Sequence, residues 1–218
     1  IDSSRGEEVR LLIESAAKEV EDLDGFYGDS QVYARHRETI VQVLGAVDRT
    51  QRNRQVSSPD ESILQAGLSA TWGEIWDRTA RHLARLEPLV PALDDLIRRL
   101  STANSWTLRA NVVCLSAQLS NIRLRNEILA AALSDKSWNV RDCALGRILA
   151  LGSRSLLRIV RKALRSETDD RVRRSAERTI QLLEKGYVAE PYDRDRVVVT
   201  LKGQGSLASR TVLRPEWD

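Results

Sequence analysis

The sequence predicts an all-α fold built around a right-handed α-solenoid of helical hairpins in residues 88–184. The first observation is a 32-residue repeat, in which an apolar residue and an arginine recur at Leu108-Arg109, Val140-Arg141 and Val172-Arg173. The second is that an apolar helical stripe follows each pair and an amphipathic segment precedes it, at residues 91–100, 122–133 and 155–165. Such a hairpin buries its apolar face only against its neighbours, so a fixed period indicates stacked repeats.

The region before the repeats, residues 1–87, is predicted to be helical and to act as a cap or as degenerate repeats. A first helix is expected over residues 7–23, where apolar residues follow helical spacing. A second helix gives way to a polar loop at residues 49–57. The third is expected to begin with Ser58 as its N-cap and to continue unbroken until Pro88 stops it.

The segment after the repeats, residues 185–218, changes character. Val197 to Leu201 is a β-type run, Gly203 and Gly205 indicate a turn, and a second short β-type run follows. We expect a short C-terminal β-hairpin or extended tail. It could cover the last repeat, because the end of a repeat stack otherwise exposes an apolar face.

The central segment resembles HEAT repeats, in the short form common in bacterial proteins. The resemblance rests on residues 135–152, DKSWNVRDCALGRILALG, and covers residues 88–184. It implies a ladder between repeats, in which a turn acid pairs with the arginine six residues later, as Asp135 with Arg141 and Glu167 with Arg173. Arg109 has Ala103 at the acid position, so we expect its guanidinium to be available for a partner. The resemblance is specific for fold and nearly silent on function.

Charge is distributed unevenly along the chain. The net charge of +3 combines −5 in residues 1–100, from 13 Lys or Arg and 18 Asp or Glu, with +8 in residues 101–218, from 21 and 13. A basic half is typical of proteins with anionic partners. The alternative is that arginine is the preferred surface residue of a GC-rich genome. Because residues 101–218 are basic, nucleic-acid binding is our second functional hypothesis.

The cysteines and the hydropathy indicate a cytoplasmic protein. Cys114 and Cys143 lie inside apolar helical stretches and are expected to be small buried residues rather than a disulfide or reactive thiols. No apolar run is long enough to span a bilayer. We therefore expect a reducing compartment and no membrane partner.

No catalytic or metal-binding constellation is visible in the sequence. Neither His36 nor His82 has a Cys or carboxylate at ligand spacing, and no cofactor motif is present. One enzymatic alternative is a HEAT-like DNA glycosylase that holds an alkylated, cationic base. Trp138 and Asp142 share a helix face and are the right kind of pair, but a cage would need a second aromatic residue such as Trp106.

The arginines of the repeat are the main candidates for a binding surface. Arg109, Arg141 and Arg173 begin the second helix of successive hairpins, and in HEAT-like stacks these helices line the concave side. Further along the same helices lie Arg147, Arg174 and Arg178. A column of guanidinium groups could hold an acidic peptide or a phosphate backbone. The alternative, favoured for Arg141 and Arg173, is that the ladder consumes their charge.

Trp106 and Trp138 occupy the same position in successive repeats. We expect them to fill the groove between repeats as core, and the alternative is that they are exposed anchors of an interaction surface. The leading functional hypothesis is a non-enzymatic scaffold that binds a protein partner on its concave face. Neither a cofactor nor a small-molecule substrate is indicated.

Overall fold

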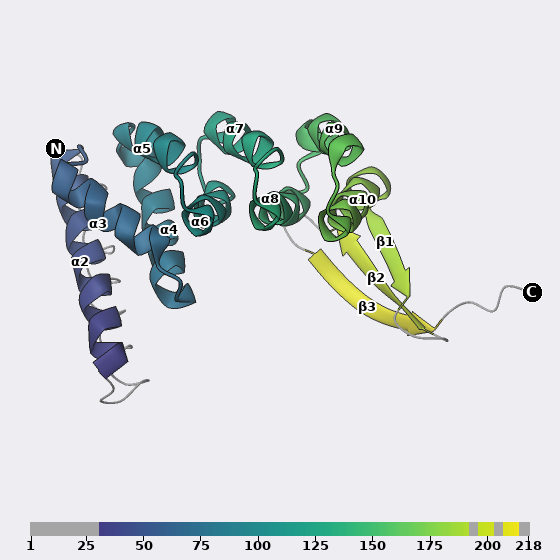
Figure 1. Ribbon diagram of the computed structural model, residues 1–218, viewed down its shortest axis with the longest axis horizontal. Coiled ribbons are helices and arrows are strands. Elements are labelled where there is room, and N and C mark those ends of the chain that lie inside the picture. The colour runs from purple at the N-terminus through teal and green to yellow at the C-terminus, as the bar shows by residue number, and fades with distance from the viewer. Residues whose placement is uncertain (1–30, 192–195, 203–206, 214–218) are drawn as a thin grey trace, which may run out of the picture. The chain divides into compact units, whose positions relative to one another are not determined.

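The computed structural model describes residues 31–191, 196–202 and 207–213, and this part of the chain is mostly helical (Figure 1). The predicted helix over residues 7–23 lies outside the described residues. The chain divides into two compact units, Ile1–Leu100 and Ser101–Asp218. The predicted start of the repeats at residue 88 is a different boundary from this division, and it stays a prediction. Within the described ranges, no helix has the length and apolar character that crossing a membrane requires.

The helices and strands are assigned as follows. The first unit contains α2 (Gln31–Asn53), α3 (Ser58–Ser69), α4 (Gly73–Leu86), the 3-10 helix η1 (Glu87–Leu89) and α5 (Ala92–Leu100). The helices of the second unit are α6 (Trp106–Ser116), α7 (Ile122–Ala132), α8 (Trp138–Leu151), the 3-10 helix η2 (Arg154–Leu156), α9 (Leu157–Ser166) and α10 (Asp170–Lys185). Its strands are β1 (Tyr187–Pro191), β2 (Arg196–Lys202) and β3 (Leu207–Leu213).

The junction of α2 and α3 corrects two expectations. Helix α2 continues to Asn53 where the sequence predicted a loop from residue 49, because Arg49 donates two hydrogen bonds, of 2.9 and 2.6 Å, to the buried Asp60 carboxylate. The N-cap of α3 is Ser57 and not Ser58, since the Ser57 hydroxyl accepts the Asp60 N–H. The contact between Arg49 and Asp60 joins the end of α2 to the start of α3, and the Ser57 cap fixes where α3 begins.

The third predicted helix is in fact two helices, which corrects the expectation of an unbroken helix up to Pro88. Helix α3 ends at Ser69 and α4 begins at Gly73. The two helices pack against each other, and Gly67 makes their close approach possible. A Cβ atom at this position would lie 2.6 Å from the Thr79 hydroxyl of α4, which is closer than real Cβ contacts.

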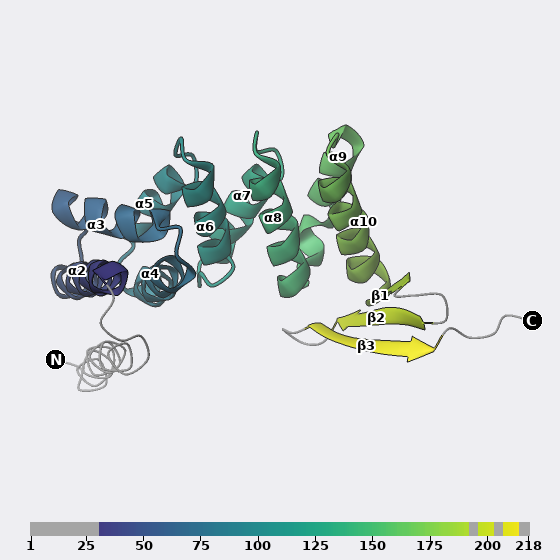
Figure 2. The same cartoon turned by 60° about the horizontal axis from the view of Figure 1, so that its bottom comes forward.

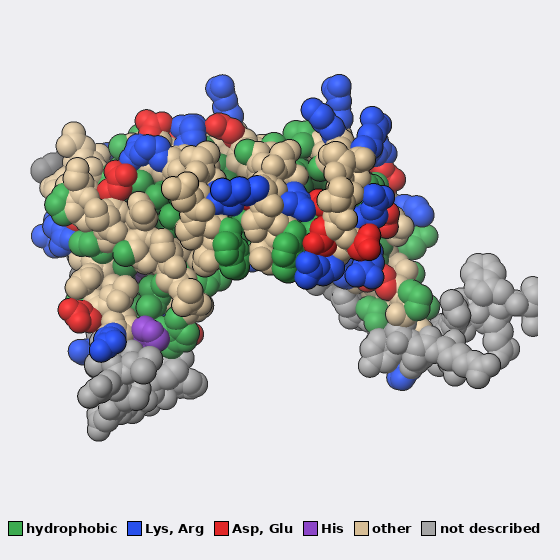
Figure 3. Space-filling view, in the orientation of Figure 1, with side chains coloured by type: hydrophobic (Ala, Val, Ile, Leu, Met, Phe, Trp, Pro, Cys, Tyr) green, Lys and Arg blue, Asp and Glu red, His purple; other side chains and the backbone are tan. Residues whose placement is uncertain are grey.

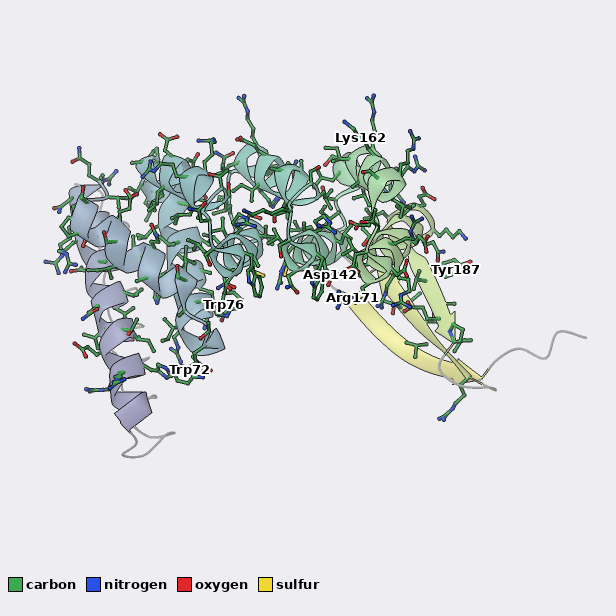
Figure 4. The ribbon with its side chains drawn as sticks, viewed as in Figure 1. Trp72, Trp76, Asp142, Lys162, Arg171 and Tyr187 are labelled. Atoms are coloured by element: carbon green, nitrogen blue, oxygen red, sulfur yellow. The ribbon has the colours of Figure 1, made fainter. Side chains whose placement is uncertain are left out.

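Trp72 and Trp76 are half-buried, and Trp72 packs against the core residues Ile40 and Ile75. Trp72 is extended at the N-cap of α4, and its ring stacks on His36 with centroids 4.0 Å apart. Figure 4 shows both tryptophans on α4. His36 is therefore held by an aromatic neighbour.

In the second unit, the first residues of three helices confirm the predicted 32-residue period. Helices α6, α8 and α10 begin at Trp106, Trp138 and Asp170, at the 32-residue period. Helix α8 contacts α6 and α10, α7 contacts α6 and α8, and α9 packs against α10 (Figures 1 and 2). The apolar residue of each repeated apolar-arginine pair is at most 2% exposed. The stripes therefore form the core between these helices.

The C-terminal hairpin is confirmed and belongs to a larger sheet. Strands β1, β2 and β3 form an antiparallel sheet in that order, and β2 pairs with β3 along its whole length. Strand β1 was not predicted because its polar sequence ends in a proline. Both β1 and β2 contact α10, and Val188 and Thr200 are buried there. The sheet thus follows the last helix directly (Figure 2).

Candidate functional site

Arg109 is buried and fully engaged, so the expectation that it is available for a partner is wrong. Its Nε and Nη2 atoms donate to the two carboxylate oxygens of Asp135 at 2.7 and 2.8 Å. Its Nη1 atom donates to the carbonyl oxygens of Ala103 and Asn104 at 2.7 and 2.9 Å. The residue is 4% exposed. Ala103, which lacks an acid side chain, contributes through its main chain.

Arg141 repeats the same arrangement one hairpin later. Its Nε and Nη2 atoms donate to the Glu167 carboxylate at 2.7 and 2.8 Å, and Nη1 donates to the Asp135 carbonyl oxygen at 2.9 Å. Each arginine therefore bonds to the acid 26 residues later and to the main chain six residues earlier. The predicted carboxylate pair of Asp135 with Arg141 is wrong, because the turn acid of one hairpin reaches the arginine of the preceding hairpin.

The two ion pairs stabilise the charged forms of all four groups. Hydrogen bonding to Asp135 raises the pKa of Arg109, and hydrogen bonding to Glu167 raises that of Arg141. Burial works against ionisation of Asp135, but hydrogen bonds from Arg109 and from a backbone N–H outweigh it and lower its pKa. The hydrogen bond from Arg141 lowers the pKa of Glu167. We name this arrangement the arginine ladder.

Depressions lie against both rungs of the arginine ladder, the first with apolar side chains such as Val113, Ile128 and Val140 in its lining and the second mainly polar. One, of about 340 Å³, is lined by residues 101–104 and 134–136 together with Arg109. The other, of about 280 Å³, is lined by residues 133–135 and 166–168 together with Arg141. The four charged groups of the ladder beside these depressions already bond to each other in pairs, and the exposed Lys136 at the edge of the first depression lies outside the ladder. The ladder therefore offers a ligand no unpaired charge at either position.

Arg173 is the third arginine of the repeat and differs from the other two. It is exposed, and its Nη2 atom donates to the Glu167 carbonyl oxygen at 2.9 Å. The position 26 residues later is Val199 in β2, where the sheet replaces a further hairpin. Within the part of the chain that the structure describes, Arg173 has no carboxylate partner. The predicted pair of Glu167 with Arg173 is wrong, because Arg141 takes the Glu167 side chain.

Trp106 and Trp138 are exposed, which corrects the expectation that they are core. Their exposed fractions are 49% and 36%. Each is the first residue of its helix, ahead of the stripe that neighbouring helices bury. Packing between helices therefore leaves much of both indole rings accessible to solvent.

Arg171 covers part of Trp138 and was not singled out from the sequence. Its guanidinium carbon lies 3.8 Å from the Trp138 ring centroid, a cation–π contact. It also donates to both Asp169 oxygens, at 3.2 and 3.0 Å, which lowers the Asp169 pKa to about 2. Figure 4 shows Arg171 beside Asp142. The signal in the sequence was the repeat itself, which places the start of α10 next to the start of α8.

Arg147 and Arg178 form contacts between elements of the second unit. Arg147 donates from Nη2 to the Cys114 sulfur at 3.3 Å, from α8 to α6. Arg178 donates to the Thr200 hydroxyl at 3.3 Å and pairs with Glu190 at 3.3 Å, which joins α10 to β2 and β1. These two predicted binding residues therefore already hold elements together.

Both cysteines are free thiols, in agreement with the sequence. Cys114 is buried, and Cys143 is half-buried. A hydrogen bond with Cys114 and burial together raise the pKa of the Cys143 thiol. A thiol with a raised pKa is a poor nucleophile near neutral pH.

Helix α9 carries a basic ridge that no carboxylate neutralises in the described part of the chain. Its members Arg158, Lys162 and Arg165 are exposed and share one face at helical spacing. Arg161 on the same helix pairs with Glu184. Figure 3 shows Lys and Arg side chains gathered over α9, and Figure 4 shows Lys162 pointing outward. The α9 ridge is the feature of the second unit that best suits a polyanion.

Among the described residues, no group of three or more His, Cys, Asp or Glu side chains could hold a metal ion. Comparison with protein-family models and with curated proteins finds no match to this chain.

Proposed function

We propose that residues 88–184 form a HEAT-like, right-handed α-solenoid and that the chain is a non-enzymatic scaffold for a protein partner. The fold proposal draws support from the 32-residue spacing of the starts of α6, α8 and α10 and from the arginine ladder that joins successive turns. Stacked repeats of this kind present an extended surface to a partner. A cytoplasmic location remains part of the proposal.

The partner surface that we propose contains Trp106 and Trp138 and lies on the concave side of the solenoid. The observation that carries this proposal is the exposure of two indole rings at equivalent positions of successive hairpins. Tryptophan and arginine are the residues most often found at the energetic centre of protein interfaces. Covering the rings would remove apolar area from water, and Arg171 beside Trp138 supplies a charged neighbour.

A capture experiment tests this surface. The tagged full chain is incubated with extract of its source organism, and bound proteins are quantified by mass spectrometry. Trp106→Ala and Trp138→Ala should each lower recovery of the specific partner about tenfold or more, as loss of a central anchor does. Ile122→Ala is the matched control, because Ile122 is 60% exposed at the start of α7. Equal recovery with all three variants would contradict the proposed surface.

Nucleic-acid binding is the second candidate, and the α9 ridge favours it. Three exposed cations at helical spacing could contact successive phosphates, and such binding weakens steeply as salt rises because counterions are released. The test is a titration with duplex DNA at 50 and 200 mM salt. Absence of binding, or binding that does not change with salt, removes this candidate.

The glycosylase alternative receives the least support. Arg171 already lies over one face of the Trp138 ring, where a cationic base would compete with it. A substrate base on that face would have to displace that arginine. The test is release of an alkylated base from duplex DNA, with Asp142→Asn as the inactive variant. No release by the unaltered chain removes the hypothesis.

A further inference from the structure

We propose that Arg173 is the open end of the arginine ladder and binds a carboxylate side chain of a partner protein. The inference deepens the proposed scaffold function, on which it rests for the choice of a protein as the source of the carboxylate. It reverses the sequence-based expectation about which arginine is available. The first copy, Arg109, is buried in a pair, and the last copy is exposed.

The two internal rungs serve as a template for what the third arginine can do. In both, one guanidinium nitrogen donates to a carbonyl oxygen in the turn before the helix, which orients the plane of the group. The remaining edge, Nε and Nη2, then faces a carboxylate and donates two hydrogen bonds of 2.7 to 2.8 Å. This two-point geometry is the one that guanidinium and carboxylate groups match best.

Arg173 keeps the hydrogen bond to a turn carbonyl oxygen but makes it with Nη2, where Arg109 and Arg141 use Nη1, so its Nε and Nη1 groups face no acceptor in the described part of the chain. It donates to the Glu167 carbonyl oxygen, at the position that Asp135 holds for Arg141 and Ala103 holds for Arg109. In the described part of the chain, its guanidinium makes no second hydrogen bond and no ion pair. A partner carboxylate would therefore meet a cation that is already partly oriented, which reduces the entropy lost on binding.

Nearby acids in the described residues do not satisfy this guanidinium. The Glu167 carboxylate bonds to Arg141 and to the N–H groups of Thr168 and Asp169. The Asp169 carboxylate bonds to Arg171. The chemistry that fits is an Asp or Glu on a turn of the partner, because turn residues Asp135 and Glu167 fill the two internal rungs.

A phosphate is the competing ligand, and the internal rungs argue for a carboxylate. In both rungs, Nε and Nη2 of the arginine donate to the two oxygens of a planar carboxylate. The exposed cations whose spacing better suits successive phosphates are those of the α9 ridge. We therefore assign the carboxylate to Arg173.

The experiment uses the full chain and a fluorescein-labelled peptide of alternating Glu and Gly, twelve residues long, as the probe. Anisotropy at 50 mM salt should show binding, and the Gln-Gly peptide should not bind. Arg173→Gln should weaken binding about fivefold to tenfold, the effect of one charge-assisted contact. The peptide affinity of Arg173→Lys should lie between those of the unaltered chain and of Arg173→Gln, because an ammonium keeps the charge but cannot donate in the two-point geometry.

Arg123→Gln is the matched control, because Arg123 is an exposed arginine of the same unit, on α7, that belongs neither to the arginine ladder nor to the α9 ridge. Its affinity should stay within about twofold of the unaltered chain. Side-chain NMR of the Arg173 Nε–Hε group during the same titration gives a second readout that does not depend on a variant. Its resonance should shift on adding the Glu-Gly peptide.

Three results overturn the inference. They are no binding of the Glu-Gly peptide, equal losses for Arg173→Gln and Arg123→Gln, or an Arg173 resonance that responds to duplex DNA and not to the peptide. Failure of the proposed scaffold function looks different. In that case the tryptophan variants recover partners normally, whatever the outcome of the peptide titration.

Discussion

Replacing Asp135 by asparagine measures how much the first rung of the arginine ladder stabilises the second unit. The Arg109 and Asp135 side chains are 5% and 12% exposed and share two hydrogen bonds. Asparagine keeps the shape of the side chain but removes its charge, and it turns an N–H2 group toward a guanidinium that has only donors. Removing one partner of a buried pair costs about 3–5 kcal/mol, because the other charge stays buried. The carbonyl contacts of Arg109 remain, so we expect about 3 kcal/mol.

The assay is thermal unfolding at pH 7, followed by circular dichroism and by tryptophan fluorescence. Trp106 and Trp138 report on the second unit. For a unit of roughly 100 residues, the expected loss lowers Tm by about 10 °C or more. Glu184→Gln is the control, because it breaks an exposed pair with Arg161 and should cost less than about 1 kcal/mol. A loss for Asp135→Asn no larger than this control refutes the reasoning.

The pH dependence of the same difference tests its electrostatic origin. The Asp135 pKa is lowered in the folded chain, since hydrogen bonds from Arg109 and Ser137 outweigh the opposing effect of burial. Such a carboxyl contributes stability that is fully present above its unfolded pKa of about 3.9 and is lost as pH falls through the folded pKa. The gap between the two proteins should be constant from pH 7 to about 5 and narrow below about 4. A constant gap down to pH 2 would contradict the ion-pair explanation.

Three further outcomes are expected. Gly67→Ala should destabilise the first unit by about 1–3 kcal/mol, because its Cβ would lie 2.6 Å from a side chain of α4, whereas Gly146→Ala meets nothing within 4 Å and should stabilise its helix by about 0.5–1 kcal/mol; denaturant unfolding compares the two. Ser105→Ala should cost about 1 kcal/mol, because its hydroxyl caps α6, and Ser137→Ala should cost less, because that hydroxyl makes no cap hydrogen bond; equal melting temperatures would count against this. Cys143 should react with iodoacetamide at pH 8 more slowly than an unstructured thiol peptide, because its pKa is raised, and mass spectrometry of the labelled peptides measures the rate.

The candidate site was predictable in its residue types and only partly in its contacts. The period of 32 identified Arg109, Arg141 and Arg173 as equivalent, and the resemblance to HEAT repeats implied turn acids as the partners of the last two. The spacing of six suggested the wrong acid for Arg141 and for Arg173, and no acid for Arg109. The correct spacing of 26 is the same repeat counted to the next turn, and nothing within one repeat distinguishes the two choices.

The sequence alone determined the features that depend on interactions between residues close together in the chain. The starts of α6, α8 and α10, with their N-caps Ser105, Ser137 and Asp169, depend on interactions within a few residues of one chain segment. The apolar stripes follow from the 3.6-residue turn. Only the tertiary structure decided which arginine is paired, because the partner acid comes from the following hairpin and the last copy has β2 in its place. It also decided that Trp106 and Trp138 are exposed, since a helix start is buried only when a neighbouring segment reaches it.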